Sequence, residues 1–225
     1  MLIILVSSQI TLYKASAGLD VSKEGDLRFL HLSWRDVQSL SESVAEKVKA
    51  VGFIPDLIIA VSRGGFDPAR ILCDQLDITR LASLQVEYYS GVNKKLDHPR
   101  VIYPLNADVE GLHALVVDDV SDTGSSLRFV RDYVIERGAS EVKIAVLHIK
   151  PWTSFVPDFF AEKVDSWIVY PWEPLETMKS MASGLRRQGL DEAQVQKKLR
   201  EMGFSIDTIG KLEFSSHTKM YRSSS

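Results

Sequence analysis

The sequence has little cysteine and no long apolar segment. Its single cysteine, Cys73, excludes an internal disulfide framework and any metal site built from several cysteines. No run approaches the ~18 apolar residues of a membrane-spanning helix. The apolar start Met1–Val6 has neither a preceding basic segment nor an Ala-x-Ala-like cleavage site, so we do not expect a signal peptide. These absences predict a cytoplasmic protein that does not bind a membrane.

The chain also lacks a strong excess of charge of one sign. Its formal net charge is −3, which gives no whole-chain argument for nucleic-acid binding, and we expect none. Of its 225 residues, 45% are hydrophobic and 25% are charged, as in an ordinary globular protein. This length suits one domain with an appendage.

One stretch in the middle of the chain combines an apolar run with a cluster of polar residues. Residues 114–117 are apolar without alternation, which is typical of a strand buried on both faces of a parallel sheet. The run ends in adjacent carboxylates, Asp118 and Asp119, and Asp122 follows after two residues. Apolar residues then recur at helical spacing, namely Leu127, Val130 and Val134. The pattern predicts a strand, a polar loop and a helix.

The polar loop has the chemistry of a site for a phosphorylated sugar. Open α/β sheets bind ligands at the carboxyl ends of their strands. A helix N-terminus offers free amides to a phosphate, and Gly124 lets the backbone approach it closely. The loop adds the hydroxyls of Ser121, Thr123, Ser125 and Ser126, so the expected 5′-phosphate contacts are Ser121, Asp122, Thr123, Gly124, Ser125 and Ser126. Carboxylates suit ribose hydroxyls and Mg²⁺. The loop therefore suits a ribose 5-phosphate, the alternative being an acidic turn that merely caps a helix.

A second loop of the same kind comes earlier in the chain. Residues 56–61 form an apolar strand-like run, and Ser62-Arg63-Gly64-Gly65 follows. Asp67 and Pro68 then predict the N-cap and first residue of a helix. An arginine among glycines suits pyrophosphate, because exposed amides and a planar charged group both bind it. The alternative is an ordinary tight turn.

Residues 116–127 resemble the 5-phosphoribosyl-1-pyrophosphate (PRPP) binding motif of type I phosphoribosyltransferases. Residues 61–68 resemble the pyrophosphate loop of the bacterial xanthine-guanine enzymes of that family. The resemblance implies an α/β fold with a central, mostly parallel sheet flanked by helices and a flexible hood hairpin. It also implies a cis peptide bond between Ser62 and Arg63. No P-loop pattern is present.

Two later segments suit a heterocyclic base. Lys150 follows a strand-like run at 142–149, and its ammonium can donate to a carbonyl of a base, although it could be an ordinary surface lysine. Trp167 suits stacking on a purine, although it could serve packing alone. Both segments resemble the base-recognition segments of the xanthine-guanine enzymes. The resemblance implies that Lys150 binds the 6-oxo group, that Trp167 stacks, and that Ile168 and Glu173 line the base edge.

A polar, basic segment lies between strand-like runs at 81–89 and 101–103. In the family that it resembles, such a hairpin is the hood that closes over the site, so we expect a hood at about 88–103. Its candidate contacts are Tyr89, Ser90, Lys94 and Lys95, and the alternative is an ordinary solvated loop.

Amphipathic helices are expected before and after these motifs. One helix should begin after Ser33 and run to about Val51. Two helices should follow the last motif, the second capped by Asp191. We expect a phosphoribosyltransferase domain at 1–174, a small helical extension at 175–214 and a polar tail at 215–225.

Together, these motifs predict a Mg²⁺-dependent purine salvage enzyme that makes a nucleoside 5′-monophosphate and pyrophosphate from PRPP and a 6-oxopurine. Asp118 and Asp119 are the expected metal ligands; the resemblance adds Glu173 as a metal ligand and puts Asp122 near the purine N7 as general base or acid. We expect a homodimer or homotetramer. The alternative is a PRPP- or nucleotide-sensing regulator of the same fold; specificity for adenine or a pyrimidine is disfavoured. The sequence does not choose among hypoxanthine, guanine and xanthine.

Overall fold

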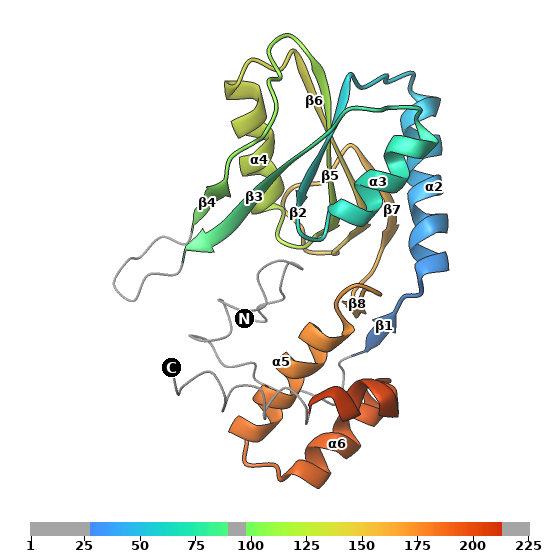
Figure 1. Ribbon diagram of the computed structural model, residues 1–225, viewed down its shortest axis with the longest axis vertical. Coiled ribbons are helices and arrows are strands. Elements are labelled where there is room, and N and C mark those ends of the chain that lie inside the picture. The colour runs from blue at the N-terminus through green and yellow to red at the C-terminus, as the bar shows by residue number, and fades with distance from the viewer. Residues whose placement is uncertain (1–27, 90–97, 213–225) are drawn as a thin grey trace, which may run out of the picture. The chain divides into compact units, whose positions relative to one another are not determined.

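The computed structural model describes residues 28–89 and 98–212 (Figure 1). The described residues fall into two compact units, which we treat separately. The first unit holds residues 34–165, and the second holds residues 28–33 with 166–212.

A six-stranded sheet forms the centre of the first unit, in the order β4-β3-β2-β5-β6-β7. Its strands are β2 (Leu57–Ser62), β3 (Leu81–Tyr89), β4 (His98–Tyr103), β5 (His113–Ser121), β6 (Glu141–Ile149) and β7 (Phe159–Lys163). All neighbours pair in parallel except β3 and β4, which pair antiparallel. The mostly parallel sheet confirms the predicted fold class.

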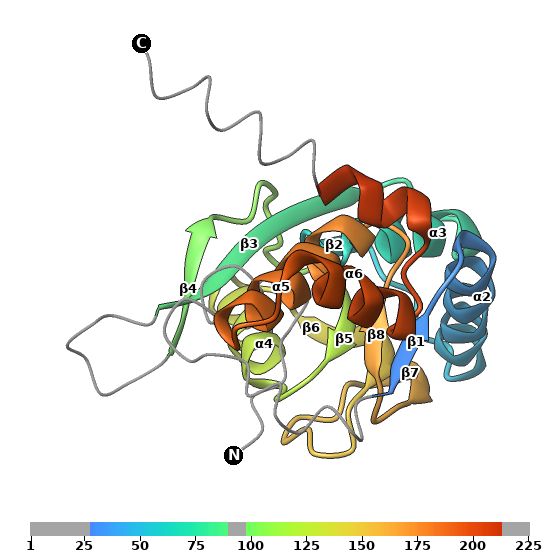
Figure 2. The ribbon, with the colours of Figure 1, turned by 90° about the horizontal axis from the view of Figure 1, so that it is seen from below.

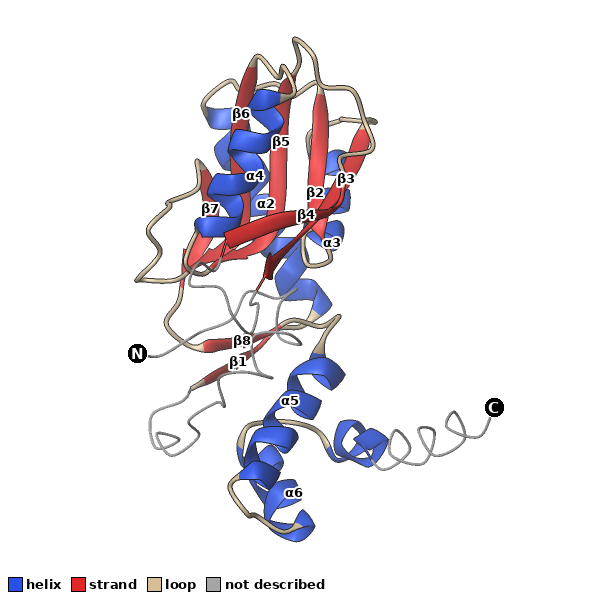
Figure 3. Cartoon of the chain, turned by 90° about the vertical axis from the view of Figure 1, so that its left-hand side faces the viewer, coloured by secondary structure: helices blue, strands red, loops and turns tan. Residues whose placement is uncertain are grey.

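Helices cover both faces of this sheet, as Figure 3 shows. Helices α2 (Trp34–Ala50) and α3 (Phe66–Gln75) lie on one face, and α4 (Ser125–Glu136) lies on the other. Successive residues of β2 therefore enter different cores: Ile58 belongs to the cluster with α2 and α3, and Ile59 to the cluster with α4. Burial on both faces explains why the central strands read as unbroken apolar runs.

The sequence pattern of α2 is confirmed. The residues at its expected apolar positions, Val37, Leu40, Val44 and Val48, are buried, and the chain leaves the helix at Gly52 with a positive φ of 70°. Positive φ is unstrained for glycine, which explains why the helix ends there.

The predicted start of α3 is wrong by two residues. Gly65, not Asp67, is the N-cap, and Asp67 and Pro68 lie inside the first turn. The reason is that the Gly65 amide donates to the Val61 carbonyl at 2.9 Å, so the chain turns into the helix directly after β2. Proline is tolerated in a first turn because the amide that it lacks has no partner there.

The second unit combines a short parallel pair of strands with two helices. Strand β1 (Phe29–His31) pairs with β8 (Trp167–Val169), and the two are seen side by side in Figure 2. Helices α5 (Pro174–Arg187) and α6 (Glu192–Glu201) follow. Met178, Met181 and Leu185 are buried on α5, and the Asp191 side chain accepts from the Gln194 amide, so both predicted helices and the predicted cap are confirmed. A further helical segment occupies residues 206–212.

The described helices can be compared with what a membrane-spanning helix requires. Among residues 28–89 and 98–212, no helix combines the length and apolar character that crossing a bilayer requires.

Candidate active site

The predicted phosphate loop connects β5 to α4. Gly124 is the N-cap of α4 and has a φ of 82°, which favours glycine over any residue with a side chain. The hydroxyls of Thr123 and Ser125 lie 2.8 Å apart, and the buried Ser126 hydroxyl has no hydrogen-bond partner among the described residues. The loop therefore gathers three hydroxyls at a helix N-terminus, which suits an anion.

A β-carbon at Gly124 would also have no room. It would lie 2.5 Å from the Phe155 β-carbon and 2.8 Å from the Thr153 hydroxyl oxygen. The loop is thus pressed against residues 153–155, which follow β6. This contact gives Gly124 a second reason to be glycine.

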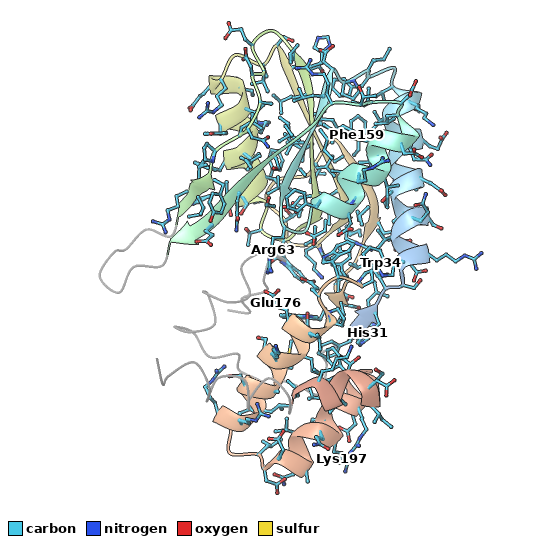
Figure 4. The ribbon with its side chains drawn as sticks, in the orientation of Figure 1. His31, Trp34, Arg63, Phe159, Glu176 and Lys197 are labelled. Carbon is cyan, nitrogen blue, oxygen red and sulfur yellow. The ribbon has the colours of Figure 1, made fainter. Side chains whose placement is uncertain are left out.

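The predicted pyrophosphate loop leaves β2, the strand next to β5. The Ser62–Arg63 peptide bond is cis, as the resemblance implied. Ser62 and Gly64 are buried, whereas Arg63 is exposed, and Figure 4 shows it at the end of β2. A β-carbon on Gly65 would lie 2.3 Å from the Val117 carbonyl oxygen of β5, so only glycine lets the loop approach that strand.

The two loops meet at one edge of the sheet. Because β2 and β5 are parallel neighbours, their carboxyl ends lie at the same edge. The structure therefore brings together the Arg63 loop and the loop from Asp118 to Ser126. Sequence patterns alone do not predict a contact between these loops, because Arg63 and Asp122 are far apart in the chain.

Asp118 and Asp119 lie near the end of β5, and both are buried. The Asp119 amide donates to the Asp118 carboxylate at 3.0 Å, which holds that carboxylate against the backbone. No group of three or more His, Cys, Asp or Glu side chains gathers within the described residues. The pair is thus a source of hard oxygen donors that does not form a complete cage for a metal.

Asp122 is almost fully buried, with 1% of its surface exposed. Burial raises its pKa from 3.8 to about 6, while the hydrogen bond from Trp152 and the charge of Lys150 oppose that rise. Its Oδ1 accepts from the Trp152 indole at 2.7 Å, and its buried Oδ2 has no partner among the described residues. A carboxyl group with a pKa near neutral and one unengaged oxygen is suited to proton transfer.

Lys150 lies beside this carboxyl group, directly after β6. Burial lowers its pKa from 10.5 to about 8, against the opposing charges of Asp122 and Asp165. Its ammonium lies 5.9 Å from the centre of the Trp152 ring. The surface-lysine alternative is wrong, because only 3% of Lys150 is exposed.

Residues 152–155 form an unpredicted clasp on the phosphate loop. The Ser154 amide and hydroxyl both donate to the Thr123 carbonyl, at 3.1 and 2.8 Å. The Ser121 hydroxyl bonds to the Thr153 hydroxyl and donates to the Phe155 carbonyl. Ser121 thus links the loop to residues 153 and 155, and its predicted contact with phosphate stays a prediction. The sequence feature that could have indicated this contact is the polar run Trp-Thr-Ser directly after Lys150-Pro151.

The other predicted base contacts belong to the second unit. Trp167 and Ile168 lie in β8 and are buried, and the Trp167 ring lies 6.5 Å from that of Phe29. Glu173 is buried and is the N-cap residue of α5. The predicted roles of these three residues in base and metal binding stay predictions.

The predicted hood is partly described. Strands β3 and β4 pair as an antiparallel hairpin whose last described pair is Tyr89 with His98. Ser90, Lys94 and Lys95 lie outside the described residues. The closure of a hood stays a prediction.

Comparisons with known proteins show the family of this chain. Residues 30–176 match the family model of the phosphoribosyl transferase domain. A xanthine-guanine phosphoribosyltransferase of Ruegeria sp. (strain TM1040) is 30% identical over 155 residues, which cover 64% of this chain and 84% of that protein. A second enzyme of that name, from Nitratidesulfovibrio vulgaris, is 31% identical over 141 residues, 62% of this chain and 78% of that protein.

Solved structures are similar in both sequence and fold. The purine phosphoribosyltransferase from Pyrococcus horikoshii Ot3 is 39% identical, with a TM-score of 0.58, over 65% of this chain and 94% of that one. A protein from Neisseria gonorrhoeae, solved with bound ppGpp, is 27% identical, with a TM-score of 0.60, over 68% and 94%. Because this family model spans more than half of the chain, the protein belongs to the phosphoribosyltransferase family.

Proposed function

We propose that this protein is a purine salvage enzyme that transfers the 5-phosphoribosyl group of PRPP to a 6-oxopurine. The products are the nucleoside 5′-monophosphate and pyrophosphate. The observation that carries the proposal is the edge of the sheet where the Arg63 loop, the Thr123–Ser126 loop and buried Asp122 and Lys150 meet. The xanthine-guanine and purine enzymes similar to this chain support a purine as acceptor.

PRPP has two anionic ends, and the edge has two anion loops. The 5′-phosphate would accept hydrogen bonds from the α4 N-terminus and from the hydroxyls of Thr123, Ser125 and Ser126. The pyrophosphate would lie against Arg63 and the amide of Gly64, whereas the Gly65 amide already donates to the Val61 carbonyl and Gly65 serves the close approach to β5. Holding both ends fixes the C1′ carbon for attack, which removes much of the entropic cost of the reaction.

Asp118 and Asp119 fit a Mg²⁺ site whose remaining ligands come from the substrate and from water. Mg²⁺ is usually held by one or two carboxylates together with substrate oxygens and water, and the buried Asp118 and Asp119 supply two carboxylates. When bound, Mg²⁺ would offset the charge of the departing pyrophosphate. The same two carboxylates would accept hydrogen bonds from the ribose hydroxyls.

The acceptor base would meet Lys150 and Asp122. With a pKa of about 8, Lys150 is mostly protonated at neutral pH and donates to the 6-oxo group, whereas the 6-amino group of adenine offers it no acceptor. The base N9 attacks C1′, and the bond from C1′ to the pyrophosphate oxygen breaks with its electron pair leaving on pyrophosphate. The N7 proton passes to Asp122, which is mostly ionised above pH 6 and can accept it.

The remaining expectations are carried as part of this proposal. Trp167 would stack on the base, Ile168 and Glu173 would line its edge, and Glu173 would reach the metal; the hood would exclude water on closure. A homo-oligomer and a cytoplasmic location remain predictions. The regulatory alternative is not favoured, because a sensor of PRPP has no need of the buried Asp122 and Lys150 pair.

The test is nucleotide formation from PRPP and Mg²⁺ with hypoxanthine, guanine, xanthine, adenine and uracil in parallel. We expect turnover only with one or more of the three 6-oxopurines. Turnover with adenine or uracil alone would refute the base assignment. Tight PRPP binding without turnover of any base would favour the regulatory alternative.

A further inference from the structure

Trp152 makes a short and specific contact that packing does not require. Its indole Nε1 donates to Asp122 Oδ1 at 2.7 Å across thirty residues of sequence. Yet 43% of Trp152 remains exposed, so the side chain contributes little to a hydrophobic core. The position of this large aromatic side chain is therefore explained better by its hydrogen bond to the buried carboxylate than by packing.

The backbone around Trp152 is fixed to the loop that carries Asp122. The Thr153 amide donates to the Lys150 carbonyl at 3.1 Å, which closes a tight turn over Pro151 and Trp152. The amide and hydroxyl of Ser154 both donate to the Thr123 carbonyl, next to Asp122. The turn and the loop therefore move together, and the distance from the indole to Asp122 is set by both.

The hydrogen bond from Trp152 makes the two oxygens of the Asp122 carboxyl group different from each other. Oδ1 accepts the indole N–H, whereas Oδ2 is buried and has no partner among the described residues. An oxygen that already accepts an N–H is a poor site for a proton. A proton taken up by Asp122 is therefore placed on Oδ2.

We propose that Trp152 is a positioning residue that aims Asp122 Oδ2 at the N7 position of the purine and keeps Oδ1 out of the proton transfer. The inference rests on the proposed transferase function and on the role of Asp122 in it. Trp152 itself acts only through the carboxylate.

The neighbouring charges set the direction of the expected pH effect. Lys150, at the end of β6, is the charged side chain that acts on Asp122, and it favours the ionised carboxylate, as the indole bond does. Burial opposes both. Without the indole donor, Asp122 should therefore ionise at a higher pH.

Two variants separate the donor from the ring. Trp152→Phe keeps an aromatic ring and removes the N–H. Trp152→Gln removes the ring but carries an amide nitrogen the same number of bonds from its β-carbon as the indole nitrogen. Trp34→Phe, at the start of α2, is the matched control for loss of an indole N–H elsewhere.

We expect Trp152→Phe to lower kcat about tenfold or more, as loss of a charge-assisted hydrogen bond would. KM for PRPP should change less than about twofold, since phosphate contacts are kept. The acidic limb of the kcat/KM pH profile should move to higher pH. Trp152→Gln should retain more activity than Trp152→Phe, and Trp34→Phe should resemble the wild type.

The double variant Asp122→Asn/Trp152→Phe tests whether Trp152 acts through Asp122. We expect Trp152→Phe to cost less than about twofold when Asp122 is already Asn, because interacting residues are not additive. An equal loss in both backgrounds would overturn the proposal. So would a Trp152→Phe enzyme with wild-type kcat and pH profile, or a Trp152→Gln enzyme weaker than Trp152→Phe. Absence of wild-type turnover would instead refute the proposed function.

Discussion

At the residue scale, the site consists of groups whose acid–base behaviour depends on burial. Asp122 and Lys150 lie side by side and have pKa values of about 6 and about 8. Burial brings each pKa closer to 7, because it removes the water that stabilises the charged form. Their mutual attraction opposes both shifts. Both are therefore mostly charged at pH 7, while each lies within reach of proton exchange.

The Asp122→Asn variant should lose activity and gain stability at neutral pH. Asp122 has a pKa of 3.8 when exposed and about 6 when folded, so the folded state holds the proton more tightly and stability falls as pH rises from about 4 to 6. Asn removes that loss of stability, which is about 3 kcal/mol at pH 7 and small at pH 4. Urea unfolding at both pH values measures it, and an equal effect at the two pH values would contradict this account. Wild-type turnover in the same variant would refute the catalytic role.

Lys150→Met should remove the preference for a 6-oxo group. We expect kcat/KM for 6-oxopurines to fall about a hundredfold, as loss of a charged hydrogen bond to the base would, while any activity with adenine is unchanged. In the wild type, KM for the 6-oxopurine should rise as pH passes about 8, where Lys150 loses its proton. Steady-state kinetics from pH 6 to pH 9 checks both, and unchanged selectivity in the variant would exclude this role.

At the element scale, the site is built where strands end and helices begin. Helix α4 starts immediately after the phosphate loop, and α3 starts immediately after the Arg63 loop. Each start needs glycine, at Gly65 for close approach to β5 and at Gly124 for positive φ and contact with Phe155. The packing of the strands and helices therefore restricts which residues can stand at these two positions of the loops.

Gly124→Ala should weaken PRPP binding. The new β-carbon would be strained at a φ of 82° and would collide with Phe155 and Thr153, so the loop would have to move. We expect KM for PRPP to rise about tenfold, which corresponds to about 1.4 kcal/mol. The control is Gly210→Ala in the helical segment 206–212, where a β-carbon meets nothing within 4 Å. A Gly124→Ala enzyme with an unchanged KM would contradict the assignment of this loop.

At the scale of the whole molecule, the sequence predicts the pattern of elements better than their contacts. The apolar stripe of α2 and the run before Asp118 predict their elements, because burial on one or two faces leaves a period in the sequence. Strand β7 (Phe159–Lys163) carries no such period, so its sequence does not predict a strand. The bond from Trp152 to Asp122 joins residues thirty apart, and no local rule predicts such a pair.

PRPP with Mg²⁺ should stabilise the whole chain. At a hundred times the dissociation constant, one ligand adds about 2.7 kcal/mol, which corresponds to a rise in Tm of roughly 5 °C or more for a chain of this size. Removing Mg²⁺ with EDTA should abolish most of the rise. Arg63→Ala should lose the rise with PRPP but keep the one with a nucleoside 5′-monophosphate, which has no pyrophosphate. Equal losses with both ligands would contradict the placement of pyrophosphate at Arg63.

The most direct test of the central claim is the product balance of the reaction itself. PRPP, Mg²⁺ and guanine or hypoxanthine are incubated with the wild-type protein, and nucleoside 5′-monophosphate and pyrophosphate are quantified together. We predict that the two products appear in equal amounts and only when a base is present. Pyrophosphate release without nucleotide, or no product with any 6-oxopurine, would contradict phosphoribosyl transfer to a purine.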